Sequence, residues 1–154
     1  MPATKPSRSN AFRDAIDQAE HLTLHEGLQA IAEGKGMIRA PKPVGSVNID
    51  RDCKPHYPQT NRWDYAIGVV NAKSTKVHYV EVHPAETNEV KVVIRKLEWL
   101  REFLEREAQA ALKKLPSECH WLASGRVRIP KTTPQYRRLQ LSQIRFHSKA
   151  LTLE

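Results

Sequence analysis

Residues 62–83 read RWDYAIGVVNAKSTKVHYVEVH, and this stretch decides the fold. Two runs rich in β-branched and aromatic residues, 62–70 and 76–83, are separated by the short polar segment 71–75. That composition favours β-strands, and so short a connection favours an antiparallel hairpin. Pro84 follows the second run, and we expect it to end the strand. The sequence therefore predicts two adjacent antiparallel strands.

A long amphipathic helix is predicted directly after the hairpin. From Asn88 to Leu115 apolar residues recur at helical spacing, while the other face is crowded with Lys, Arg and Glu. Thr87 is a good N-cap, and Glu89 in the first turn suits the helix dipole. Pro116 is expected to terminate this helix.

The N-terminal part of the chain is expected to hold two helices and one strand. A capped helix is predicted over 10–20, and a capping-box pattern predicts a second helical piece over 24–33. The alternation of apolar and polar residues over 45–50 is typical of a strand with one wet face. Residues 51–61 contain three turn signals in succession and are interpreted as a loop.

The order of these elements favours an α/β (α+β) fold. A fourth strand is predicted over 120–125, so we expect a central mixed sheet of about four strands flanked by helices on its two faces. The predicted organisation is a flexible leader at 1–9, a core at 10–125, and a basic C-terminal extension at 126–154 that packs on the core.

Length and composition indicate one globular domain. The chain has 154 residues, of which 40% are apolar and 27% are charged, and no apolar run is long enough to span a bilayer. No hydrophobic stretch follows the basic N-terminus, so a secretory signal is not expected. The two cysteines, Cys53 and Cys119, form no disulfide framework and indicate a reducing, cytoplasmic location.

Positive charge is concentrated near the C-terminus. The net charge is +8, and residues 119–153 contain seven Lys or Arg but no Asp or Glu. A segment of one sign attracts polyanions by counterion release, so we predict DNA or RNA as a partner. The alternative is a solvated surface that is merely basic. The predicted nucleic-acid contacts are Arg126, Arg128, Lys131, Arg137 and Arg138.

Two carboxylates stand out in the hairpin. Asp64 and Glu81 lie in segments where a carboxylate is unfavourable unless something compensates its charge. Converging from neighbouring strands, they could hold a hard divalent cation that activates water against a phosphodiester. Two structural alternatives remain open. Asp64 could form a surface ion pair with Arg62, and Glu81 could lie on the wet face of the sheet.

The order of elements and the acidic spacing resemble the PD-(D/E)xK nuclease superfamily, which has the restriction-endonuclease-like fold. In that family an Asp on the second strand and a Glu-x-Lys on the third surround Mg²⁺, and a helix follows. The resemblance matches Asp64 and Glu81 to the two acidic positions. It implies Mg²⁺, or Mn²⁺, bound by Asp64, Glu81 and the backbone carbonyl of Val82.

This sequence departs from the family at His83, where a Lys is usual. The family's Lys is thought to orient the attacking water or to stabilise negative charge, and a protonated His could supply the same charge. A neutral His could instead be a general base or a metal ligand. Lys91 and Lys96 on the following helix are possible substitutes, and Lys91 is expected to be the better placed.

A zinc site is a weaker possibility. Cys53-x-x-His56 and the pair Cys119-His120 offer four ligands, but adjacent residues rarely bind one ion. No ligand spacing is matched by His25, His78 and His147. The chain has no P-loop, dinucleotide or nucleophile-elbow motif.

Two functional hypotheses follow from these patterns. The first is a metal-dependent nuclease, with Asp64, Glu81, His83 and Lys91 as its catalytic residues. The second is a non-catalytic nucleic-acid-binding or assembly subunit that keeps the same fold. Either could work as a homodimer or within a larger complex.

Overall fold

The computed structural model describes residues 10–72 and 74–154, so the predicted leader lies outside the described residues. The α-helices are α1 (Ala11–Gln18), α2 (Ile49–Cys53), α3 (Val90–Glu105), α4 (Ala110–Lys114) and α5 (Pro134–Leu141). The strands are β1 (Ile38–Arg39), β2 (Pro43–Asn48), β3 (Tyr65–Asn71), β4 (Ser74–Glu86), β5 (Ser117–Arg128), β6 (Ile144–His147) and β7 (Leu151–Thr152). Three 3₁₀ turns are η1 (Lys35–Met37), η2 (Thr87–Glu89) and η3 (Glu107–Gln109).

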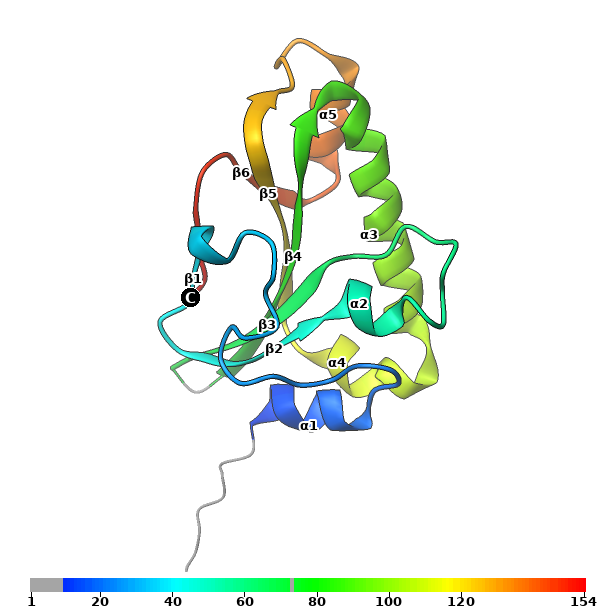
Figure 1. The fold of residues 1–154 in the computed structure, drawn as a ribbon, viewed down its shortest axis with the longest axis vertical. Helices are drawn as coiled ribbons and strands as arrows, with labels where there is room; N and C mark the ends of the chain where they lie inside the picture. The colour runs from blue at the N-terminus through cyan, green and yellow to red at the C-terminus, as the bar shows by residue number, and fades with distance from the viewer. Residues whose placement is uncertain (1–9, 73) are drawn as a thin grey trace, which may run out of the picture.

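A five-stranded mixed sheet in the order β2-β3-β4-β5-β6 forms the centre of the molecule (Figure 1). The strands β2, β3 and β4 pair antiparallel, whereas β5 pairs parallel with β4, and β6 pairs parallel with β5. The predicted hairpin and the mixed α/β (α+β) class are confirmed. The fifth strand, β6, comes from the basic C-terminal stretch.

Strand β4 continues through Pro84, so the prediction that this proline ends the strand is wrong. The register between β4 and β5 shifts between His83 and Ala85, which leaves Pro84 at an irregularity where its missing N–H is tolerated. The strand then pairs with β5 as far as Glu86 and Arg128. This extension carries β4 and β5 past the start of β3 (Figure 1).

All five α-helices contribute buried residues to the core on one face of the sheet. The other face is covered by apolar residues of the segment 28–40 and by a small parallel sheet of β1 and β7. The prediction that helices cover both faces of the sheet is therefore wrong, because the α-helices lie on one face alone. Within residues 10–72 and 74–154, no helix is both long and apolar enough to cross a membrane.

The predicted helix over 24–33 is absent because tertiary partners satisfy its backbone instead. His25 forms an isolated antiparallel bridge with Ser46, and Gly27 adopts a positive φ of 50°. The hydroxyl of Tyr65 accepts hydrogen bonds from the N–H groups of Ala32 and Glu33, at 3.1 and 2.8 Å. The hydroxyl of Ser46 on β2 likewise accepts from the N–H of Ala30. These contacts with β2 and β3 therefore replace the helix that the capping-box pattern predicted.

The predicted helix 88–115 is broken into α3 and α4 at Arg106, whose backbone is extended. The buried Gln109 explains the break, because its amide donates to the carbonyl of Phe103 and accepts from the N–H of Glu20. Thr87 does not cap the helix; its hydroxyl donates to the carbonyl of Arg128. Residues 49–53, expected as strand end and loop, form α2, which the side chain of Asn48 caps.

Gly68 of β3 should be one of the least replaceable residues of the sheet. A Cβ at this position would lie 2.4 Å from Cγ of Phe12 on α1, whereas a Cβ at Gly36 would meet nothing within 4 Å. We expect Gly68→Ala to lower the free energy of unfolding by about 1–3 kcal/mol, as overpacking usually does. Urea unfolding measures this, with Gly36→Ala as the matched control. Equal stabilities of the two variants would show that α1 does not pack as described.

Candidate active site

The start of β3 and the middle of β4 bring two carboxylates together on the helix-covered face. Asp64 directly precedes β3, and the pairing of Tyr65 with Val80 places it beside Glu81. The N–H of Asp64 donates to Oε1 of Glu81 at 3.1 Å, and the N–H of Val82 donates to Oδ2 of Asp64 at 2.9 Å. Each carboxylate is therefore fixed by the backbone of the other's strand.

Lys96 of α3 inserts its ammonium between these two carboxylates. Its Nζ lies 2.5 Å from Oε2 of Glu81 and 3.8 Å from Oδ1 of Asp64. Burial alone would lower the pKa of Lys96, but the charges of Glu81 and Asp64 outweigh it and raise the pKa. A single cation thus reaches both groups at once, as a bound metal ion would have to do.

Burial gives Asp64 an unusual pKa. Glu81 is fully buried, and the side chain of Asp64 is 15% exposed. Burial and then the charge of Glu81 raise the pKa of Asp64 to about 7, although Lys96 and the N–H of Val82 oppose the shift. The pair therefore carries less than its full negative charge near neutral pH unless a further cation joins it.

His83 lies between two carboxylates, but its second partner is Glu89 rather than Asp64. Nδ1 lies 3.2 Å from Oε2 of Glu81, and Nε2 lies 2.5 Å from Oε1 of Glu89. Burial would lower the pKa of His83, yet its hydrogen bonds to Glu81 and Glu89 raise it above the ordinary value. The indole N–H of Trp121 donates to the carbonyl of His83 at 3.0 Å and holds this part of β4 in place. The site favours a protonated imidazole.

Both structural alternatives for the carboxylates are wrong. Arg62 forms its ion pair with Asp50, at 2.9 Å, instead of with Asp64. Glu81 is completely inaccessible, so it does not lie on a wet face of the sheet. Burying a carboxylate costs free energy of desolvation. Buried ionisable groups of this kind are typical of functional sites.

The lysine that reaches the carboxylates is Lys96, not Lys91. Lys91 is exposed and lines a hollow together with Arg138 of α5. Glu89 was not expected as a site residue. It lies in η2, six residues after His83, and no periodicity in the sequence points to this contact.

The basic residues predicted to bind nucleic acid are exposed. Arg126 lies within the register shift of β5, Arg128 lies just beyond it, and Lys131 lies in the connection to α5. Arg137 and Arg138 lie on α5, which contacts α3 and η2. Figure 1 shows α5 beside the end where β4 and β5 run past β3. These residues therefore border the end of the sheet toward which β4 runs from the carboxylates.

The zinc arrangement considered from the cysteines does not form. Cys53 is buried in the core, and the ring of His56 stacks on His21 with centroids 3.6 Å apart. Both cysteines are free thiols. In the part of the chain that the structure describes, only one group of His, Cys, Asp or Glu has three ligand atoms within 4.8 Å of one another: His78, Glu118 and His120.

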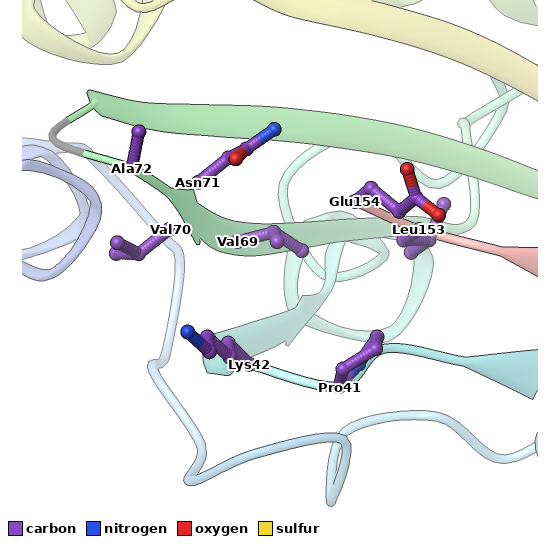
Figure 2. Close-up of a pocket in the computed structure, with 8 residues that line it drawn as sticks. All are labelled: Pro41, Lys42, Val69, Val70, Asn71, Ala72, Leu153 and Glu154. Carbon is purple, nitrogen blue, oxygen red and sulfur yellow. The ribbon is translucent and has the colours of Figure 1, made fainter.

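A hollow of about 290 Å³ lies near the turn of the hairpin (Figure 2). Residues 69–72 form one wall, and Lys42 and Glu154 are its only charged lining residues among those described. None of the predicted catalytic or basic residues lines it. The candidate active site is thus defined by its buried carboxylates rather than by this hollow.

Comparisons with protein-family models, curated proteins and solved structures found no match to this chain.

Proposed function

We propose that this protein is a divalent-metal-dependent nuclease that hydrolyses phosphodiesters of DNA or RNA. The observation that carries the proposal is the Lys96 ammonium in contact with both Glu81 and Asp64. It marks one position that a cation occupies between a fully buried carboxylate and a largely buried one. Carboxylate oxygens are the ligands that Mg²⁺ and Mn²⁺ prefer. Asp64 and Glu81 would hold the ion, with the carbonyl of Val82 as the further contact that the family resemblance implies.

The residues around this position have distinct roles in the proposed reaction. Bound Mg²⁺ or Mn²⁺ would supply a Lewis acid and lower the pKa of a coordinated water. Lys96, released from the carboxylates, would orient the attacking water and offset negative charge on the phosphate. His83, held by Glu81 and Glu89, would add positive charge at the same end of β4.

Cleavage is the direct test of this proposal. We expect wild-type protein to nick plasmid DNA or to cut RNA with Mg²⁺ or Mn²⁺, and to lose the activity in chelator. Asp64→Asn should lower the rate by about 100-fold or more, since each tenfold corresponds to about 1.4 kcal/mol and metal-ion catalysis supplies several. Lys91→Met, on the exposed face of α3, is the control and should cut at the wild-type rate.

The second candidate is a non-catalytic nucleic-acid-binding or assembly subunit. One observation favours it: Lys96, His83 and the backbone already satisfy both carboxylates without any ligand. In that case wild type and Asp64→Asn would be equally inert in every metal, while binding of nucleic acid would persist.

Binding by α5 has a measurable salt signature. Replacing Arg137 and Arg138 together with Gln should weaken binding of DNA or RNA and reduce the slope of log K against log salt by about 1.8, or about 0.9 per lost phosphate contact on a duplex. Fluorescence anisotropy from low to moderate salt measures the slope. The matched control replaces Lys113 and Lys114 of α4, at the other end of α3. An unchanged slope in the α5 variant would place the nucleic acid elsewhere.

The proposed setting is the cytoplasm, where the free thiols of Cys53 and Cys119 would stay reduced. A homodimer would let two such sites cut both strands of a duplex.

A further inference from the structure

Three histidines form a continuous chain on the face of the sheet opposite Glu81. His78 of β4, His120 of β5 and His147 of β6 stand on neighbouring strands. Nδ1 of His78 lies 2.9 Å from Nε2 of His120, and Nδ1 of His120 lies 3.0 Å from Nε2 of His147. At the other end, Nε2 of His78 lies 3.3 Å from the main-chain oxygen of Glu154.

Glu118 completes a triangle of donor atoms at the centre of this chain. Its Oε1 lies 3.8 Å from Nδ1 of His78 and 3.6 Å from Nε2 of His120, and the two nitrogens are 2.9 Å apart. A tetrahedral zinc ion with bonds of about 2.0–2.1 Å needs its ligand atoms about 3.3 Å from one another. The three distances between the ligand atoms, 2.9 to 3.8 Å, lie on both sides of that value. An ion therefore needs only small side-chain shifts and no movement of the strands.

We propose that His78, His120 and Glu118 bind a divalent transition-metal ion of the zinc class, with its fourth position open. Two imidazoles and one carboxylate suit zinc, whereas Mg²⁺ prefers an all-oxygen set. Successive residues of a strand point to opposite faces, so His78 and Glu81 place this site and the carboxylate pair on different faces of β4. The two metal sites are independent.

The outer contacts of the two histidines suit the tautomers that an ion requires. A main-chain oxygen can only accept, so its contact with His78 keeps the proton on Nε2 and leaves Nδ1 for the ion. In the metal-free protein Nδ1 of His78 then accepts a hydrogen bond from the Nε2–H of His120. Loading would move the proton of His120 to Nδ1, where Nε2 of His147 can accept the hydrogen bond, so neither ligand has to lose a proton.

Charges around the triangle are compatible with an ion. Burial, and then the neighbouring His78 and His147, lower the pKa of His120 to about 3, and burial lowers the pKa of His78 as well. Both shifts disfavour the charged imidazole, which is the form that cannot bind an ion. Lys76 and Arg145 contact Oε2 of Glu118, at 2.5 and 3.2 Å, which leaves Oε1 free. These two cations oppose a further positive charge, so we expect weaker binding than at thiolate sites.

The test is titration of the full chain, after treatment with chelator, with Zn²⁺ by calorimetry and with Co²⁺ by visible absorption. We expect one equivalent with the absorption bands of tetrahedral Co²⁺. His147→Gln should weaken binding by about 10–100-fold, as loss of an outer-shell partner does, and His78→Gln or His120→Gln should weaken it more. Circular dichroism checks that the variants fold.

Glu118→Gln keeps the test decisive if the buried histidine variants unfold, because its side chain is 22% exposed. This variant should bind Co²⁺ more weakly than wild type. Asp64→Asn should keep the site intact, as should His25→Gln, which removes a histidine outside the chain. The proposal would be overturned if wild type bound neither Zn²⁺ nor Co²⁺, or if Glu118→Gln and His147→Gln both bound the ion with wild-type affinity.

Discussion

Replacement of Lys96 with methionine should destabilise the metal-free protein by about 3–5 kcal/mol at pH 8, which is the usual cost of removing one partner from a buried ion pair. Methionine fills a similar volume but leaves Glu81, which is fully buried, and Asp64 without the ammonium they share. Urea unfolding in chelator measures the loss. Uptake of a proton by Asp64, whose pKa is raised to about 7, limits the loss at lower pH, so the effect should shrink as the solution becomes more acidic.

The matched control for this experiment is Lys91→Met, one and a half turns earlier on the same helix. Lys91 is exposed, so its replacement should change the free energy of unfolding by no more than about 0.5 kcal/mol. Similar losses in the two variants would mean that Lys96 does not bridge the carboxylates in solution.

Asp64→Asn should make the metal-free protein more stable than wild type above pH 7. The pKa of Asp64 in the folded protein is about 7, against an ordinary value of 3.8. The folded state therefore holds a proton that the unfolded chain releases, and this contribution is complete below about pH 4 and lost by about pH 7. Asparagine keeps an oxygen for the N–H of Val82 but carries no charge. The stability of the Asp64→Asn protein should therefore not fall over that pH range.

The size of this effect follows from the shift in pKa. About 1.4 kcal/mol per pH unit gives an upper limit of about 4 kcal/mol for the gain in Asp64→Asn at pH 8, and neighbouring charges reduce it. Urea unfolding at several values between pH 4 and pH 8 in chelator measures it, and the two proteins should converge at the acidic end. If the variant were less stable than wild type at pH 8, Asp64 would be a structural residue and not one held for a ligand. A gain in protein stability when a buried charge is removed is typical of functional sites.

The parts of this protein that the sequence predicted are those governed by local patterns. The hairpin β3–β4 and the face of α3 follow from periodicity, and the convergence of Asp64 and Glu81 follows from their places on adjacent strands. The helix expected over 24–33 failed because Ser46 and Tyr65, distant in sequence, bind its backbone. Local propensity cannot anticipate such partners.

The rest of both sites depends on contacts between distant segments. Lys96 of α3 reaches the carboxylates, and Glu89 of η2 reaches His83, because these elements pack against the end of β4. No spacing near Glu81 in the sequence indicates either contact. His78 and His120 are 42 residues apart, and they meet only because β5 pairs in parallel with β4 in one particular register. A shift of one residue would move either histidine to the other face.

The central claim is that Asp64 and Glu81 form a divalent-metal site, which the Lys96 ammonium occupies in the metal-free protein. The thermal stabilisation that Mg²⁺ or Mn²⁺ produces at pH 8 tests this claim most directly. Any ion that binds only the folded state raises its stability according to its affinity. We predict a larger shift in melting temperature for Lys96→Met than for wild type, because the competing ammonium is gone, and little or no shift for Asp64→Asn. Equal shifts in all three proteins, or none in any of them, would contradict the claim.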